Sequence, residues 1–266
     1  MKPIVHRPTS WPTRLLRLGR LGMHLLRGLL VIATRYPHLS QPARAVITQR
    51  WSRHLLHILA IKVRVHGTPP AVYPANTLVV ANHISWLDIF ALNSVTVSRF
   101  VAKKELRDWP LAGFLIKNAG TLFIERNNRR DASRVNEQLA KALQDGGCMA
   151  VFPEATTSDG RSLLPFKASL FEASRLAHAT VQPVAIRYLT PGGHYCAAAA
   201  YAGDTSFWQS LCLILASRAM VVELSYTAAI PPYDTALASR FQLSETARDA
   251  IRDALQLPAE PVAAAE

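Results

Sequence analysis

Acidic residues are absent from the first third of this 266-residue chain. The first 87 residues hold 12 Lys and Arg but neither Asp nor Glu, since the first carboxylate of the chain is Asp88. From Asp88 onward 18 basic and 18 acidic residues balance, so the whole net charge of +12 lies before it. This asymmetry argues against a protein that coats nucleic acid with a uniformly basic surface. It predicts a neutral globular body behind a cationic leader.

Cysteine and long apolar runs are also scarce. Cys148, Cys196 and Cys212 stand in apolar runs without a C-x-x-C pair, which argues against a disulfide scaffold or a zinc site and fits a reducing compartment. No window reaches the roughly 18 uninterrupted apolar residues that a membrane-spanning helix needs. Half of the residues are nevertheless hydrophobic and only 18% are charged, which excludes wholesale disorder.

Several catalytic motifs are missing as well. The chain has no G-x-S-x-G elbow, no glycine-rich phosphate loop, no G-x-G-x-x-G and no H-E-x-x-H. These absences argue against a covalent serine hydrolase, a P-loop enzyme and a Rossmann oxidoreductase.

The leader, residues 1–66, predicts two basic amphipathic helices. In 14–34 the basic residues recur every three or four positions, so that they share one helix face with an apolar stripe beside it. The segment 43–62 repeats the pattern, and the Pro-containing stretch 36–42 predicts the turn between them. The basic face of the first helix holds Arg14, Arg17, Arg20, His24 and Arg27, and its apolar stripe holds Leu15, Leu18, Gly22, Leu25 and Leu29.

Two such helices without acids are typical of a pair that lies in a membrane interface. The apolar stripe would enter the headgroup boundary, and the arginines would face anionic lipid. A helical hairpin packed on the body with its arginines in solvent is the plainer alternative, although a surface helix normally carries some Glu or Asp. A nucleic-acid-binding arm is the third, but no aromatic and basic platform follows.

The body alternates apolar runs of strand length with helical stretches. Continuous apolar runs such as 78–81 are typical of strands covered on both faces. The pattern predicts an α/β domain over 67–240, with a mostly parallel sheet flanked by helices, and a final helix with a loose tail over 241–266. Strands are predicted at 61–66, 77–82, 99–102, 121–125, 148–152, 181–188, 195–201 and 221–226, and helices at 84–95, 110–118, 132–144, 170–178 and 240–254.

Polar residues cluster where the predicted strands end, which is the edge at which open α/β sheets place their sites. His83 and Asp88 are five positions apart, so they meet only if His83 lies on the turn leaving the strand and Asp88 in the first turn of the next helix. Such a pair is an imidazole oriented by a carboxylate, a general base for a hydroxyl. Alternatively, Ser85 and Asp88 form a capping box and serve only the helix N-terminus.

Three further clusters follow other strands. Arg126, directly after a predicted strand, is an anion clamp or part of a solvated basic turn. Glu154 ends another strand and leads into Thr156 and two more hydroxyl residues; the plain alternative is an ordinary Asp-Gly loop. Pro183 in the segment 181–186 marks an edge strand or a bulge.

In order and spacing, these clusters resemble the glycerolipid acyltransferase family over about residues 78–190. The four blocks that carry the resemblance are Asn82-His83-x-x-x-x-Asp88 with Ser85 in its filling, Phe123-Ile124-Glu125-Arg126, Phe152-Pro153-Glu154, and Val181 to Ile186 with Pro183. The N-terminal two-helix membrane motif is also common in that family, in agreement with the leader.

The resemblance implies roles for these residues. His83 would remove a proton from the acceptor hydroxyl, and Asp88 would orient and charge-balance it. The alkoxide would attack the thioester of acyl-coenzyme A or acyl-carrier protein without an acyl-enzyme intermediate. No cofactor and no metal is implied. Arg126 and Glu154 would help to bind the acceptor headgroup, with Thr156 and Lys167 as further substrate-binding candidates and with Asn82, Ser85, Phe123, Pro153 and Pro183 in support.

The third block departs from the family pattern. It usually reads Phe-Pro-Glu-Gly-Thr-Arg-Ser, but this chain has Ala155 for the glycine and Thr157 for the arginine. One expected phosphate ligand is therefore missing, and Lys167 is the candidate to replace it. The run Thr-Thr-Ser-Asp-Gly followed by Pro-Phe-Lys resembles a branch that includes acyltransferases making ornithine lipids.

We therefore expect an acyltransferase that converts 1-acyl-sn-glycerol-3-phosphate to phosphatidic acid. Lyso-ornithine lipid or another lysophospholipid is the alternative acceptor. A non-catalytic membrane-binding adaptor is a further alternative, although decayed enzymes tend to lose the His/Asp pair that this chain keeps. We expect peripheral attachment to anionic lipid at the cytoplasmic face of a bacterial inner membrane, with no nucleic-acid partner.

Overall fold

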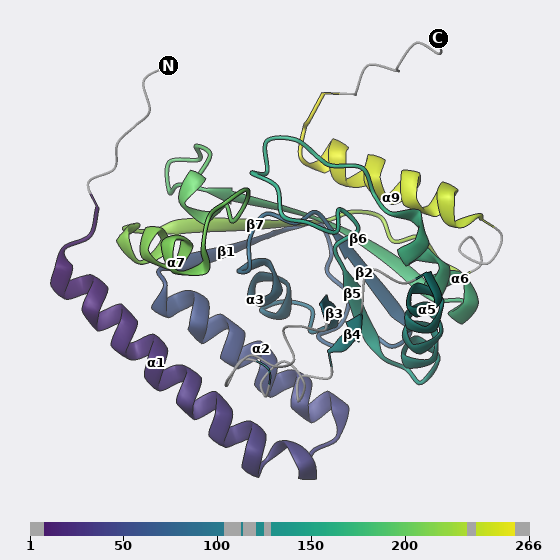
Figure 1. Ribbon diagram of the computed structural model, residues 1–266, viewed down its shortest axis with the longest axis horizontal. Coiled ribbons are helices and arrows are strands. Elements are labelled where there is room, and N and C mark those ends of the chain that lie inside the picture. Colours follow the sequence, from purple (N-terminus) through teal and green to yellow (C-terminus); the bar gives the residue numbers. More distant parts are fainter. Residues whose placement is uncertain (1–7, 104–112, 114–120, 125–128, 233–237, 259–266) are drawn as a thin grey trace.

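A sheet between two layers of helices forms the body of the protein in a computed structural model, which describes residues 8–103, 113, 121–124, 129–232 and 238–258 (Figure 1). Its strands are β1 (Ile61–His66), β2 (Thr77–Ala81), β3 (Arg99–Lys103), β4 (Leu122–Ile124), β5 (Cys148–Val151), β6 (Thr180–Leu189) and β7 (Met220–Tyr226). The strand order is β1-β7-β6-β2-β5-β3-β4, and every neighbouring pair is parallel except β6 and β7. The predicted α/β fold with a mostly parallel sheet is confirmed.

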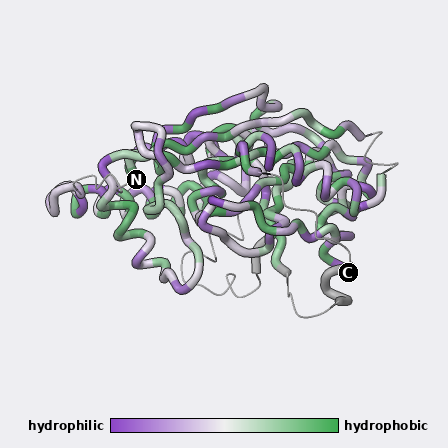
Figure 2. The backbone as a smooth tube through the Cα atoms, turned by 90° about the horizontal axis from the view of Figure 1, so that it is seen from above, coloured by the Kyte–Doolittle hydropathy of each residue, from purple (hydrophilic) through white to green (hydrophobic). Residues whose placement is uncertain are grey.

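Each face of the sheet has its own hydrophobic core. One core takes residues from α1 (Trp11–Thr34), α2 (Gln41–Ile58), α3 (Asp88–Asn93) and α7 (Phe207–Ala216), and the other from α5 (Arg129–Gln144), α6 (Glu172–Ala177) and α9 (Arg240–Ala254). Short 3-10 helices are η1 (Tyr36–His38), η3 (Ala168–Phe171) and η4 (Ala197–Ala199). Hydrophobic and hydrophilic positions mix along the helices of both outer layers, as expected for helices that cover a sheet on one side only (Figure 2).

The strand β2 shows why its sequence is apolar without alternation. Leu78 and Val80 point into one core, whereas Val79 and Ala81 point into the other, and all four are at most 1% exposed. Successive side chains of a strand face opposite sides, so a strand covered by helices on both faces needs apolar residues at every position.

Two predicted elements differ from the structure. The predicted strand 195–201 is wrong, because this segment contains η4 and only one isolated bridge, between Leu189 and Tyr195. A run of alanines fills it, and alanine has little preference for strands. The helix predicted at 84–95 is shorter, since α3 begins only at Asp88. The helix predicted at 110–118 lies almost wholly outside the described residues.

Pro183 does not mark an edge strand, because β6 is paired with β2 on one side and β7 on the other. The alternative of a bulge agrees with the structure. Between the pairs Val181–Ile230 and Val184–Tyr226, two residues of β6 face three residues of the opposite segment. A proline without an N–H donor fits such an interruption of the ladder, and its carbonyl still accepts from the Thr227 N–H at 3.2 Å.

The described part of the leader, from residue 8, contains the hairpin of α1 and α2, and its last six residues are β1, which pairs with β7 in the sheet. In α1 the orientation of the basic face differs from the prediction. Arg17 points toward the body and His24 toward α2: the Arg17 guanidinium donates to the Ser217 carbonyl at 2.6 Å, and the His24 imidazole lies 3.0 Å from the Trp51 carbonyl. Leu18 and Leu25 of the predicted lipid-facing stripe also pack on the core.

The apolar stripe that faces outward from α1 shares Leu15 with the predicted one. At about 100° per residue, the residues of this outward stripe cluster on the side of α1 opposite the buried Leu21, His24 and Gly28. Arg20 and Arg27 lie next to the stripe on the helix surface. Among the described residues, no helix is long and apolar enough to cross a membrane. The outward stripe consists of Leu15, Leu16, Met23, Leu26 and Leu30, each between 58% and 68% exposed.

Candidate active site

The candidate site lies at the carboxyl ends of adjacent parallel strands. Val80 of β2 is in register with Val151 of β5, so the segments that leave these two strands emerge side by side. His83 follows β2 and Glu154 follows β5. The edge is the one at which parallel sheets place ligands, as the sequence predicted.

His83 and Asp88 meet through the geometry that their spacing required. His83 lies on the turn after β2, and Asp88 is the first residue of α3. The His83 Nδ1 atom lies 2.8 Å from Asp88 Oδ2. Asp88 is fully buried, whereas the His83 side chain keeps 20% of its surface exposed. The pair therefore presents an imidazole to solvent and hides the carboxylate behind it.

Four donors surround the buried Asp88 carboxylate. Its Oδ2 atom accepts from His83 and from the backbone N–H groups of Ile84 and Ser85, at 2.7 and 2.9 Å, and its Oδ1 atom accepts from the Tyr188 hydroxyl at 2.8 Å. Such compensation is what a buried charge requires. The alternative of a capping box is wrong, because Leu87 is the N-cap of α3 and no side chain caps this helix, although the Asp88 carboxylate accepts from the Ser85 N–H. The Ser85 hydroxyl has no partner among the described residues.

The contacts of His83 fix its tautomer and its ring plane. A carboxylate only accepts hydrogen bonds, so Nδ1 carries the proton and Nε2 of the neutral ring has the free lone pair. The ring stacks on Phe152, with centroids 4.0 Å apart and planes 9° apart. Phe152 in turn stacks on Phe100 at 5.8 Å. The imidazole is thus held ready to accept a proton at Nε2.

Glu154 joins the segment that follows β2 to the segment that follows β5. It is 4% exposed, and its carboxylate accepts from the backbone N–H of His83 at 2.7 Å and from that of Leu164 at 3.0 Å. The Ser158 N–H also donates to the His83 carbonyl at 2.8 Å. These bonds tie the segment after β2 to the segment after β5. The headgroup-binding role that the resemblance implies for Glu154 stays a prediction.

Glu154 is expected to make stability depend on pH. Burial raises the pKa of its carboxyl from an ordinary 4.5 to about 7. Between these values the folded chain holds a proton that the unfolded chain has lost, so the free energy of unfolding falls as pH rises, by about 1.4 kcal/mol per pH unit. Urea titrations between about pH 5 and 8 should show a shallower fall for Glu154→Gln than for the unmodified protein. Parallel curves would contradict the buried, proton-binding carboxyl.

Tyr188 is the site residue that the sequence did not single out. It lies on β6, is 2% exposed, and donates its hydroxyl hydrogen to Asp88 Oδ1. Burial first, and the charge of Asp88 second, raise its pKa well above the ordinary value, so the hydroxyl keeps its proton. The available signal was a tyrosine near the end of a predicted central strand, because a buried tyrosine hydroxyl needs a partner.

Tyr188→Phe is expected to lower kcat roughly tenfold, because it leaves Asp88 Oδ1 without its donor and loosens the carboxylate that holds His83. Tyr226→Phe is the matched control: this buried hydroxyl donates to Thr96 at 3.0 Å, away from the pair. Both variants should lose about 1–3 kcal/mol of stability. Equal kcat values in the two variants would contradict a positioning role for Tyr188.

Asn82 and Pro153 hold the framework of the site. The Asn82 side chain accepts from Ile186 N–H at 2.7 Å and donates to the Ile186 carbonyl at 3.0 Å, so it continues the pairing of β2 with β6 beyond the last backbone pair. The buried Pro153 accepts from the backbone N–H of Lys167 at 2.9 Å. Phe123 is half-buried on β4, beside β3.

Of the predicted headgroup-binding residues, the structure describes some and not others. Thr156 and the Lys167 side chain are exposed. Arg126 lies outside the described residues. Substrate binding by all three stays a prediction.

The structure shows how Ala155 and Thr157, the two departures from the family pattern in the third block, are accommodated. Ala155 has a φ of 59°, in the left-handed region that glycine adopts most easily, which accounts for the glycine of the family pattern. Thr157, which replaces the arginine, donates its hydroxyl to the Tyr201 carbonyl. The position of the usual arginine is therefore used here to join two loops.

The fold and the site define a class: an α/β protein with a carboxylate-oriented histidine at the carboxyl edge of its sheet. Comparisons with known proteins agree with this class. The profile of the Acyltransferase family matches residues 62–187. A 1-acyl-sn-glycerol-3-phosphate acyltransferase of Neisseria meningitidis is 38% identical over 246 residues, 91% of this chain and 93% of that protein. A lyso-ornithine lipid O-acyltransferase of Pseudomonas aeruginosa is 37% identical over 214 residues, 80% of each chain.

The chain belongs to the glycerolipid acyltransferase family and is an acyltransferase. The crystal structure of the 1-acyl-sn-glycerophosphate acyltransferase of Thermotoga maritima matches the fold with a TM-score of 0.62 at 20% identity, over 91% of this chain and 96% of that one. The sequence resemblance is thereby confirmed at the level of family and fold.

Proposed function

We propose that the protein transfers a fatty acyl group from acyl-coenzyme A or acyl-carrier protein to the free hydroxyl of a lysolipid. His83 Nε2 takes the hydroxyl proton while the hydroxyl oxygen forms a bond to the thioester carbon. The carbon–sulfur bond then breaks, and the leaving thiolate takes the proton back from the imidazolium. Asp88 stabilises that transient positive charge.

The His83–Asp88 pair is the observation that carries this proposal. Among the described residues no hydrogen-bond partner of Nε2 is seen, the Nδ1 atom is held by a fully buried carboxylate, and the ring stacks on Phe152. A positioned base is what an alcohol acceptor needs, because a hydroxyl at neutral pH is a weak nucleophile. Neither a cofactor nor a metal takes part in the proposed reaction.

We propose 1-acyl-sn-glycerol-3-phosphate as the acceptor and phosphatidic acid as the product. The support is the Neisseria meningitidis relative, which is similar over nearly all of both chains and is named for that acceptor. Lyso-ornithine lipid is the second candidate. Thr157 in place of an arginine favours it, as does the Pseudomonas aeruginosa relative named for that acceptor.

A competition assay separates the two acceptors. The purified full chain is given labelled acyl-coenzyme A with lysophosphatidic acid, lyso-ornithine lipid and lysophosphatidylethanolamine, singly and mixed. We expect the highest kcat/KM with lysophosphatidic acid. A preference for lyso-ornithine lipid would select the second candidate, and no transfer to any acceptor from coenzyme A or carrier-protein donors would favour the non-catalytic adaptor.

We further propose that the leader attaches the protein to anionic lipid at the cytoplasmic face of a bacterial inner membrane. The outward apolar stripe of α1 and the flanking Arg20 and Arg27 support peripheral binding, since together they match an interfacial amphipathic helix. The absence of acids from the first 87 residues is the electrostatic support. Peripheral attachment would bring the site to a substrate that resides in the bilayer.

A further inference from the structure

The helix α7 exposes an apolar face that the leader does not explain. This helix has no charged residue, and it packs on the core through Leu211, Ile214 and Leu215. On the other side of the helix, the exposed residues of the segment 208–213 span about 140°, at 100° per residue. They are Trp208, Gln209, Cys212 and Leu213. Trp208 is 60% and Leu213 49% exposed, unusually high values for large apolar side chains in contact with water.

The leader and α7 are fastened together at the C-terminal end of α7. The Thr9 N–H donates to the Ala216 carbonyl at 2.9 Å, and the Thr9 hydroxyl donates to the Leu215 carbonyl at 3.0 Å. Arg17 donates to the Leu215 and Ser217 carbonyls at 3.2 and 2.6 Å. A cation at the C-terminal end of a helix also stabilises its dipole. The N-terminal part of α1 and the C-terminal end of α7 are therefore in direct contact.

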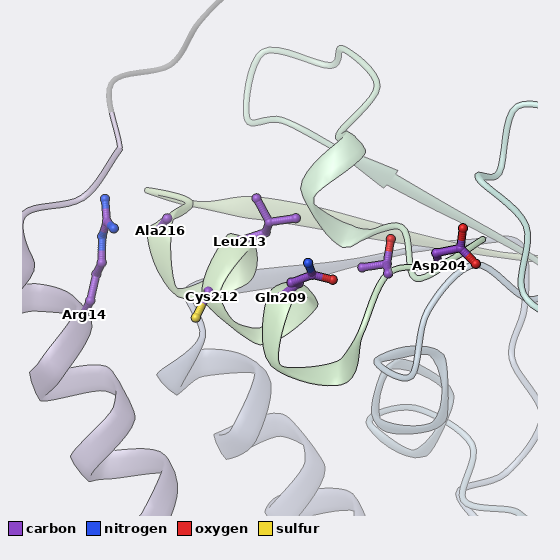
Figure 3. Close-up of a pocket in the computed structure, with 7 residues that line it drawn as sticks. Arg14, Asp204, Gln209, Cys212, Leu213 and Ala216 are labelled. Atoms are coloured by element: carbon purple, nitrogen blue, oxygen red, sulfur yellow. The ribbon is translucent and has the colours of Figure 1, made fainter.

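An open groove lies between α1 and α7. It has a volume of about 710 Å³, with Arg14 on the α1 side and Cys212 and Leu213 among the α7 residues (Figure 3). Arg14 lies 5.3 Å over the ring of Trp11, which is 70% exposed. An arginine next to an exposed tryptophan is typical of the boundary between lipid headgroups and acyl chains.

Basic residues outnumber acidic residues on α1 and next to α7, although not in the groove itself. Among the residues that line the groove, Arg14 and Asp204 balance each other. The excess positive charge comes from residues outside this lining: α1, which has no acidic residue, also carries Arg17, Arg20 and Arg27, and Arg218 follows α7. This excess favours an anionic surface.

The first turn of α7 also contacts the active-site segment. Trp86, which lies between His83 and Asp88 in the sequence, donates its indole N–H to Ser210 at 3.1 Å, and its ring lies 5.2 Å from that of Phe207. We infer that α7 is a second membrane-contacting element: Trp208, Leu213 and the groove beside Arg14 bind the surface of an anionic bilayer, and Trp86 joins this contact to the catalytic segment. The inference rests on the membrane attachment proposed above.

Cys212 offers a site-specific probe of this contact. It is the exposed cysteine of the three, whereas Cys148 and Cys196 are buried, and burial raises the pKa of the Cys148 thiol to about 12. The full chain, labelled at Cys212 with the fluorophore NBD, is mixed with phosphatidylcholine vesicles that contain one-third phosphatidylglycerol. We expect a blue shift and a severalfold rise in NBD emission. The same label on Thr246→Cys in a Cys212→Ser background, on the exposed side of α9, should not respond.

Co-sedimentation with the same vesicles separates the possible failures. If the chain sediments with the vesicles but the emission of the Cys212 label does not change, the role of α7 is overturned while membrane attachment by the leader is supported. A chain that does not sediment would overturn both. A label that responds to acyl-carrier protein but not to vesicles would assign the face to a protein partner and overturn the inference.

Substitutions on α7 test the energetic contribution of the face. Trp208→Ser and Leu213→Ser are each expected to weaken vesicle binding roughly tenfold, because each removes apolar area from the lipid contact. Phe241→Ser on α9, where the phenyl ring is 62% exposed, is the matched control and should bind as the unmodified chain does. Equal affinities for all variants would overturn the inference.

Discussion

His83→Ala is expected to lower kcat by about 10³-fold, because a positioned general base contributes roughly 10²–10⁴-fold to a reaction limited by proton transfer. The KM values for donor and acceptor should change little, since the imidazole acts on the hydroxyl proton and the remainder of the site is intact. The fold should survive as well. Asp88 keeps its bonds from Ile84, Ser85 and Tyr188 after the imidazole is removed. The measurement is the initial rate of acyl transfer with purified protein, together with circular dichroism.

His194→Ala is the control for this variant. His194 is exposed, and its contacts with Thr190 come from the backbone. Full activity is expected. Near-normal turnover of His83→Ala would remove the base from the proposed mechanism and would leave positioning of the two substrates as the source of catalysis. A folded His83→Ala variant that still binds vesicles would also separate chemistry from membrane attachment.

The chemistry-bearing part of the fold was the most predictable from sequence. The predicted bounds of β1 and α9 agree with the structure, because each has a clear hydrophobic pattern and a defined start. The geometry required for His83 and Asp88 followed from their spacing alone, since five residues reach from a strand end to a first helical turn. Short-range features of this kind depend on local backbone geometry, which the sequence specifies directly.

The helix α7 shows what local patterning missed. Its apolar run lacks a regular polar face, because part of its outer surface is apolar too. A readable start signal was nevertheless present. Ser206 accepts from Gln209 N–H while the Gln209 side chain accepts from Ser206 N–H, which is a capping box with the spacing S-x-x-Q.

Tyr188 and the orientation of α1 depended on tertiary packing. Tyr188 lies 100 residues beyond Asp88 and reaches it through the register of β6 against β2. The periodicity of α1 by itself predicts that its basic stripe faces lipid, because it carries no information about the elements that pack on the helix. In the folded protein Arg17 caps α7 and His24 stacks on Trp51, so the partner elements decide which side of an amphipathic helix is inward.

Asp88→Asn is expected to lower kcat by about 10³-fold as well, and to destabilise the fold. An asparagine has one acceptor oxygen and one NH2 group, whereas both oxygens of Asp88 accept hydrogen bonds. If the NH2 group replaces Oδ2, it faces the donors of His83, Ile84 and Ser85. If it replaces Oδ1, it faces Tyr188, and in either orientation the charge that balances the imidazolium is gone.

Asp159→Asn is the control for Asp88→Asn, because Asp159 is exposed and accepts from the Arg161 N–H in the neighbouring loop. It should keep nearly full activity and stability. Residues that act as one unit have non-additive effects, so His83→Ala combined with Asp88→Asn should be scarcely slower than His83→Ala alone. A double variant slower by the product of the two single effects would show that Asp88 contributes independently of His83. Asp88 would then act directly on substrate, and the buried position of its carboxylate makes this the outcome we do not expect.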